Sequence, residues 1–299
     1  MGLSISRNKK YIFYVLYSVI LLIVLLYFRF PSGAFKEYIR ANINSISPEN
    51  ILLIREVKPA FPVGISLVNA RFSKRANPDI RYFTADSITV RPQIWSFLLG
   101  RLKFDFLCNV NKGLVEGNIC FIEKKIGSPF KSSIEFKSIK IAEASSFSSL
   151  IECDLNGKLD GALTYSSSGD EKLLDGTGEA EFNIKGGRIN FFQPIPMFDS
   201  IEFEDLSVRC LMEKRKLRLN HFELLGQEMT GTLSGEIRLN NDISKSAVNI
   251  KGSIELSPEF FKNRKDSSAF FSYFRERMKN GRISFMLTGN FSEPRFTLL

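Results

Sequence analysis

Apolar and polar residues alternate along most of this chain. In "KFDFLCNVN", Phe104, Phe106 and Val110 lie in one phase, and residues of the other phase are mostly polar. The same period of two returns in "GEAEFNIKGG", "VNIKGSIEL" and "GRISFMLTGNF". Because successive side chains of a strand point to opposite faces, these segments predict strands with one apolar and one polar face. This pattern is typical of antiparallel sheets.

A glycine phrase occurs three times, as "GLVEGNICF" from Gly113, "GKLDGALTY" from Gly157 and "GTLSGEIRL" from Gly231. Glycines four apart can pack membrane helices, but charged residues such as Glu116 and Asp160 stand between or beside these glycines. We predict that each phrase marks the start of a strand and bends the sheet, so that the repeat belongs to one curved surface. The alternative is that a β-rich chain simply collects glycine at its hairpins.

The N-terminal segment Tyr11 to Phe28 contains no charged residue. As a helix it would rise ~27 Å, enough for the hydrocarbon core of a bilayer. A basic tail precedes it, and it is longer than the ~7–15 apolar residues of a cleaved signal peptide. We therefore expect a cytoplasmic tail and an uncleaved transmembrane anchor in residues 1–30, and one periplasmic β-rich domain in residues 31–299.

The expected fold is mainly β. It comprises the single N-terminal transmembrane helix and an elongated, curved, mostly antiparallel, groove-like sheet with a few short helices. "GAFKEYIRANINSI" predicts a helix that Pro48 stops, and "PQIWSFLLGR" a short helix between Pro92 and Gly100. The phenylalanine-rich segment between Ser257 and Gly281 predicts a further helix, and its part from Phe260 to Phe274 is the alternative cover of the apolar face, which would close the core.

Charge and cysteine usage exclude little by themselves. The net charge is +9, but basic residues are scattered among acidic ones, so nucleic acid is not an expected partner. A basic domain beside an anionic leaflet and an ordinary solvated face both remain open. None of the four cysteines forms a C-x-x-C pair, and we expect small buried hydrophobes, with a Cys108–Cys120 disulfide as the alternative.

Catalytic signatures are not found in the sequence. His221 is the only histidine, and its alternation with Leu217 and Leu219 predicts that it points toward the apolar side. No G-x-S-x-G elbow, phosphate-binding loop or H-E-x-x-H helix occurs. We therefore expect a protein that is not an enzyme, with no catalytic, cofactor-binding or metal-binding residues.

Several stretches together resemble a known family. After the apolar N-terminal segment come "VKPAFPVGISLVNARF", "ADSITVRPQIWSFLLGRLKFDFLCNVNKGLVEGNI", "MTGTLSGEIRL" and "GRISFMLTGNFSEPRFTL". This order is similar to the type II secretion system protein N family of Gram-negative bacteria, itself similar to the AsmA-like proteins of the cell envelope. The resemblance covers most of the chain from Leu52 to Leu299. It implies an inner-membrane anchor, a periplasmic body and a long curved sheet whose concave face is apolar.

Two functions follow from this resemblance. In the first, the chain is an accessory component of type II secretion or envelope biogenesis whose apolar groove holds the acyl chains of membrane phospholipids. In the second, it is a structural adaptor of the secretion apparatus, with a closed β-sandwich and no lipid. The expected partners are phospholipids and other secretion or envelope components. The predicted groove comprises Phe104, Phe106, Val110, Phe182, Ile184, Ile250, Ile254, Ile283 and Phe285.

Overall fold

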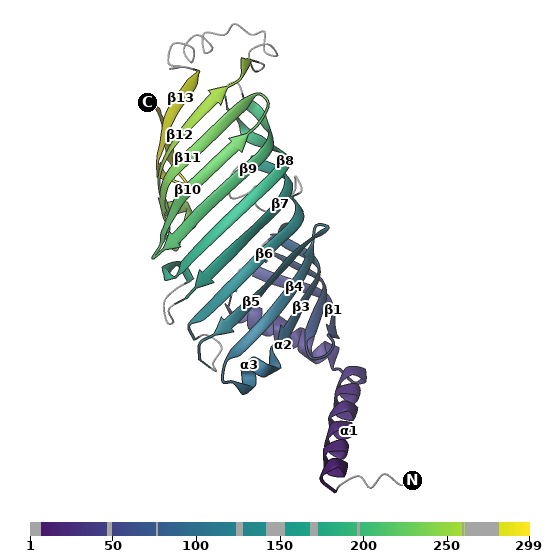
Figure 1. The fold of residues 1–299 in the computed structure, drawn as a ribbon. Helices are drawn as coiled ribbons and strands as arrows, with labels where there is room; N and C mark the ends of the chain where they lie inside the picture. Colours follow the sequence, from purple (N-terminus) through teal and green to yellow (C-terminus); the bar gives the residue numbers. More distant parts are fainter. Residues whose placement is uncertain are drawn as a thin grey trace.

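The computed structural model describes residues 7–46, 50–75, 77–123, 128–141, 153–167, 173–195, 198–258, 260 and 281–299. These residues contain one antiparallel sheet of 14 strands (Figure 1). The strands are β1 (Asn50–Pro59), β2 (Ile65–Lys74), β3 (Asn77–Pro92), β4 (Leu102–Val110), β5 (Gly113–Phe121), β6 (Phe130–Ile141), β7 (Cys153–Ser166), β8 (Thr177–Ile195), β9 (Phe198–Glu213), β10 (Lys216–Leu225), β11 (Met229–Arg238), β12 (Ala247–Leu256), β13 (Arg282–Asn290) and β14 (Pro294–Leu298). The helices are α1 (Arg7–Phe28), α2 (Ser32–Ile46), α3 (Ile94–Leu98) and the short 3₁₀ turns η1 (Leu173–Asp175) and η2 (Ile243–Lys245).

Each strand pairs with the next one along the chain, so the sheet follows the sequence from β1 to β14. The prediction of a mainly β, antiparallel fold with few helices is confirmed. The described strands form one open sheet and not two facing sheets. Of the phenylalanine-rich segment Phe260 to Phe274 that could cover one face, only Phe260 is among the described residues. Pairing between consecutive strands explains the result, because each described strand lies beside the next one along the chain, including β12 and β13 across their longer connection.

Two hairpins show how local residues set the strand order. Asn111 and Lys112 form a two-residue turn with φ of 47° and 62°, and the turn of Lys214 and Arg215 has φ of 45° and 66°. Positive φ at both central positions gives a turn whose twist matches that of the flanking strands. The second turn has neither glycine nor asparagine at its central positions, and the Arg215 guanidinium is paired with Asp175 of η1.

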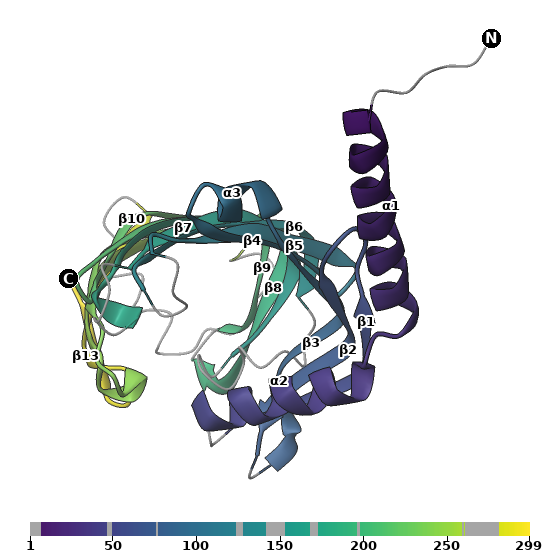
Figure 2. The same cartoon turned by 90° about the horizontal axis from the view of Figure 1, so that it is seen from below.

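The sheet is curved, and α2 lies on its inner side beside β1 (Figure 2). Phe35 and Ile39 of α2 pack against a buried cluster that includes Leu52, Ile54 and Val57 of β1. The predicted helix before Pro48 is therefore confirmed, and its apolar stripe explains why it docks there. The short helix expected between Pro92 and Gly100 is also confirmed as α3.

The helix α1 is 22 residues long and projects away from the sheet in both views (Figures 1 and 2). Large apolar side chains along it are exposed, from Tyr11 at 64% to Phe28 at 82%. Counted over the residues that the structure describes, no helix has the length and hydropathy of a membrane span. The helix predicted between Ser257 and Gly281 lies, apart from three residues at its start, outside the described residues.

Candidate apolar binding face

The pairing register places the apolar residues of successive strands on one face of the sheet. Directly paired residues share a face, and the pairs include Phe106 with Gly117, Ile184 with Leu206, and Ile254 with Ile283. We call this side the apolar face. At the described paired positions of β4 to β14 it carries no charged residue. All nine residues predicted for the groove lie on it, namely Phe104, Phe106, Val110, Phe182, Ile184, Ile250, Ile254, Ile283 and Phe285.

These nine residues differ in burial. The smaller side chains Val110, Ile184 and Ile283 are at most 6% exposed. The phenylalanine rings, such as Phe106 and Phe182, are only half-buried. The aliphatic side chains of the apolar face are therefore buried, whereas its aromatic rings keep part of their surface accessible among the described residues.

A row of aromatic rings crosses four neighbouring strands on this face. The ring centroids are 6.4 Å apart for Phe104 and Phe121, 5.9 Å for Phe121 and Phe130, and 5.7 Å for Phe130 and Tyr165. Edge-to-face and tilted contacts at this spacing stabilise the sheet beyond simple burial. The row crosses the starts of β4 and β6 and the ends of β5 and β7. These strand ends lie along the same edge of the sheet as α3, which directly precedes β4.

Four glycines of the apolar face each lie directly opposite a phenylalanine. The pairs are Gly117 with Phe106, Gly161 with Phe182, Gly187 with Phe203, and Gly252 with Phe285. A Cβ added at any of them would lie 2.3–2.8 Å from a ring carbon of its partner. The rings therefore lie over the glycines and along the sheet, which is the arrangement known to cover strand glycines in β proteins.

The glycine phrases lie at positions in the strands that differ from the prediction. Only Gly113 begins a strand, whereas Gly157 and Gly231 lie inside β7 and β11, so the expected strand starts are wrong at two of three sites. Gly157 has φ of +142° at a register shift against β8. A side chain is strained at this φ, so the position requires glycine where the ladder is irregular.

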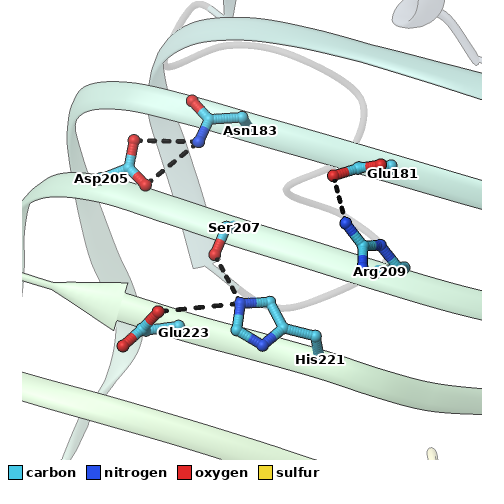
Figure 3. Close-up of polar contacts among 7 residues, drawn as sticks. All are labelled: Glu181, Asn183, Asp205, Ser207, Arg209, His221 and Glu223. Carbon is cyan, nitrogen blue, oxygen red and sulfur yellow. Dashed lines mark hydrogen bonds and ion pairs between the residues drawn. The ribbon is translucent and has the colours of Figure 1, made fainter.

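The opposite side of the sheet, which we call the polar face, carries cross-strand charge pairs (Figure 3). Arg209 Nη2 lies 2.8 Å from Glu181 Oε1, and Asn183 donates to Asp205 at 3.0 Å. The hydrogen bond that Arg209 donates to the Glu181 carboxylate raises the pKa of Arg209. The Arg209–Glu181 pair is exposed and such pairs are weak, so it marks the water-facing side of the sheet more than it stabilises it, whereas the Asn183–Asp205 contact is half-buried.

The position predicted for His221 is wrong, because it lies on the polar face. A register shift after Leu219 places His221 opposite Arg209, with its side chain 49% exposed. Its Nε2 lies 3.0 Å from Ser207 Oγ and 3.7 Å from Glu223 Oε2 (Figure 3). A catalytic triad needs the nucleophile and the carboxylate on different ring nitrogens, so this group lacks triad geometry.

The two cysteines proposed as a disulfide lie on opposite faces of the sheet. Cys108 pairs with Val115 on the apolar face, whereas Cys120 pairs with Lys103 on the polar face, and both thiols are free. The alternative disulfide is therefore wrong, because alternate positions of paired strands cannot meet through the sheet. Burial, with a smaller effect of Asp86, raises the pKa of Cys108 to about 11, as expected for a small buried hydrophobe.

No protein-family model, curated protein or solved structure matches this chain. Within the described ranges, no group of three or more His, Cys, Asp or Glu side chains is arranged to hold a metal ion. The resemblance to the type II secretion system protein N family remains a prediction that rests on the sequence alone. The apolar face is the most extensive chemical feature that the described strands share.

Proposed function

We propose that this chain is a non-enzymatic protein of the bacterial inner membrane that holds lipid acyl chains on its apolar face. One observation carries the proposal: apolar side chains occupy the same face from β4 to β14, and the charged side chains of the paired positions occupy the other. Phe260 packs on part of this face, in one buried cluster with Ile184 and Ile283. The rings of Phe106 and Phe182 keep part of their surface accessible among the described residues, and exposed apolar patches mark interaction sites. An acyl chain is the ligand that needs no polar partner.

The dimensions and chemistry of the sheet support this ligand. At ~4.8 Å per strand, 14 strands reach about 62 Å before twist is counted, which is longer than a single acyl chain. Flat rings such as Phe182 over Gly161 present apolar surface without projecting far from the sheet. A lipid would therefore lie along the concave side with its chains on the rings and its headgroup toward water.

In this proposal α1 crosses the inner membrane once, with the N-terminus in the cytoplasm and the sheet in the periplasm. The support is the uncharged sequence Tyr11 to Phe28 and the basic residues before it. The anchor would keep the apolar face beside a source of phospholipid. It would also fix the chain in the compartment where envelope and secretion components assemble.

The cellular role follows from the family resemblance and is part of the same proposal. The chain would serve type II secretion and envelope biogenesis as an accessory component that takes part in lipid or protein transport. Its partners would be phospholipids and other secretion or envelope proteins. An adaptor that binds protein and no lipid is the competing outcome of the test below.

The test is mass spectrometry of the phospholipid that co-purifies with the full chain from detergent. Ile250→Asp places a carboxylate on the apolar face, where contact with hydrocarbon is strongly unfavourable. Ser284→Asp adds the same charge to the polar face of a neighbouring strand and serves as the matched control. We expect less lipid with Ile250→Asp than with the control, although both proteins keep the circular dichroism of the parent.

Lipid around α1 gives the same background in every variant, so the difference between the variants is the informative quantity. Equal lipid in the parent and both variants would exclude lipid binding on the apolar face. The adaptor hypothesis would then be the better one, and affinity capture of envelope proteins on the same three samples would test it.

A further inference from the structure

The helix α3 presents its apolar side chains outward. None of its residues is buried. Trp95 and Leu98 are 80% and 69% exposed, and Leu99, directly after the helix, is 82% exposed. A surface helix of a globular domain normally turns such residues toward the core. The exposed apolar side chains of α3 therefore indicate a binding surface on the outer side of the sheet.

Polar contacts hold α3 in this orientation. The Gln93 side chain donates to both carboxylate oxygens of Asp105 at 2.8 and 3.0 Å, and it accepts a hydrogen bond from Ser96 at 3.0 Å. The Gln93 backbone N–H also bonds to the carbonyl of Lys103. The polar side of the helix is thus fixed to the sheet, and the apolar side is left toward the exterior.

The hairpin turn between β1 and β2 lies near the start of α3. A Cβ added at Gly64 in this turn would lie 2.6 Å from the carbonyl oxygen of Val90, at the end of β3. We call the exposed apolar surface of α3 and the residue after it the α3 patch; it comprises Ile94, Trp95, Phe97, Leu98 and Leu99.

Basic residues precede and follow α3 in the sequence, and the Asp105 carboxylate beside them accepts hydrogen bonds from Gln93. Residues 91–103 contain Arg91, Arg101 and Lys103 and no acidic residue. Basic residues near a membrane attract anionic headgroups at roughly 1 kcal/mol each, and tryptophan prefers the headgroup region. Figure 1 shows α3 at the end of the molecule from which α1 projects, and Figure 2 shows it on the outer side of the sheet.

We propose that the α3 patch inserts into the headgroup region of an anionic phospholipid membrane. This inference rests on the proposed function in one respect, because α1 would hold the patch beside that membrane. The partner is inferred to be lipid because the patch combines an exposed tryptophan, exposed aliphatic side chains and basic residues before and after α3 in the sequence. With α1 it would form a second attachment point that fixes how the aromatic row beside α3 faces the bilayer.

Trp95 is the only tryptophan of the chain and reports directly on this contact. The full chain is incorporated into vesicles of anionic phospholipid whose acyl chains carry bromine, and its emission is compared with that in unbrominated vesicles. We expect bromine to quench Trp95 and the emission to be blue-shifted relative to the protein in solution. The double substitution Trp95→Phe and Leu225→Trp places the probe on the polar face and should be unaffected by bromine.

A third protein, with Trp95→Phe and Phe296→Trp, reports lipid on the apolar face, and flotation after an alkaline wash reports the anchor. If Trp95 is as insensitive to bromine as the Leu225→Trp probe, the inference is wrong, whatever the other two readouts show. If Trp95 is quenched and Phe296→Trp is not, the membrane contact stands and the lipid-holding function fails. Phe97→Ser with Leu99→Ser should reduce the quenching of Trp95, and an unchanged signal would contradict insertion of the patch.

Discussion

Replacement of Gly161 by alanine tests the close approach of rings and glycines on the apolar face. A Cβ at Gly161 would lie 2.6 Å from the Phe182 ring and 2.6 Å from the carbonyl oxygen of Glu181. That oxygen belongs to the adjacent strand and cannot move without disturbing the ladder. Gly231 offers the matched control, because its nearest neighbour would be Leu224 Cβ at 3.9 Å, an ordinary contact.

The two substitutions should have opposite signs. Overpacking in a well-packed site costs about 1–3 kcal/mol of the free energy of unfolding. Alanine without a clash stabilises a strand by roughly 0.5–1 kcal/mol relative to glycine, because the unfolded chain loses freedom. We expect Gly161→Ala to be destabilised by about 1–2 kcal/mol, and Gly231→Ala to be unchanged or slightly stabilised.

The assay is urea unfolding of the full chain in mild detergent, followed by far-ultraviolet circular dichroism. A double-mutant cycle with Phe182→Leu locates the effect, because the smaller side chain should relieve part of the cost of Gly161→Ala. Equal stability changes at Gly161 and Gly231 would refute the reasoning. So would strict additivity with Phe182→Leu, since the ring would then not be what the added methyl group meets.

Three further outcomes follow from the geometry. Burial keeps the Cys108 thiol protonated to about pH 11, so mass-spectrometric labelling with a thiol reagent at pH 8 should modify Cys120 well before Cys108. Since an unfolded thiol ionises near pH ~8.5, the contribution of Cys108 to folding stability should fall as the pH rises above that value. His221→Ala should change the free energy of unfolding by less than about 0.5 kcal/mol, because its contact with Ser207 is exposed. Ile39→Asp should detach α2 from β1 and cost about 2–4 kcal/mol, measured as earlier urea unfolding and faster proteolysis after α2.

The strands and the shared face were predictable because both depend on local periodicity. The positions of Phe104, Phe182 and Ile250 within alternating segments already place each on the apolar side of its strand. Sequential hairpins then bring these sides together without any long-range choice of partner. The order β1 to β14 therefore needs little more information than the turns supply.

Irregular strand pairing and the cross-strand partners of individual residues were harder to predict from the sequence. His221 was misplaced because an extra residue in β10 reverses the alternation, and no nearby glycine or proline signals that bulge. Gly252 pairs with Phe285 on the next strand, which follows a connection of 25 residues. This pairing depends on the strand register, which local sequence does not specify. The exposed side of α3 was missed for a related reason, because its orientation depends on the contact between Gln93 and Asp105.

The most direct test of the central claim compares two adjacent residues that face opposite sides of the sheet. A photoreactive phenylalanine analogue is placed at Phe182, on the apolar face, or at Glu181, on the polar face, in the full chain within intact cells. After irradiation, the purified chain is analysed for covalently attached phospholipid by mass spectrometry. We predict lipid adducts from position 182 and few or none from position 181; equal adducts at both positions, or only protein adducts at 182, would contradict lipid binding on the apolar face.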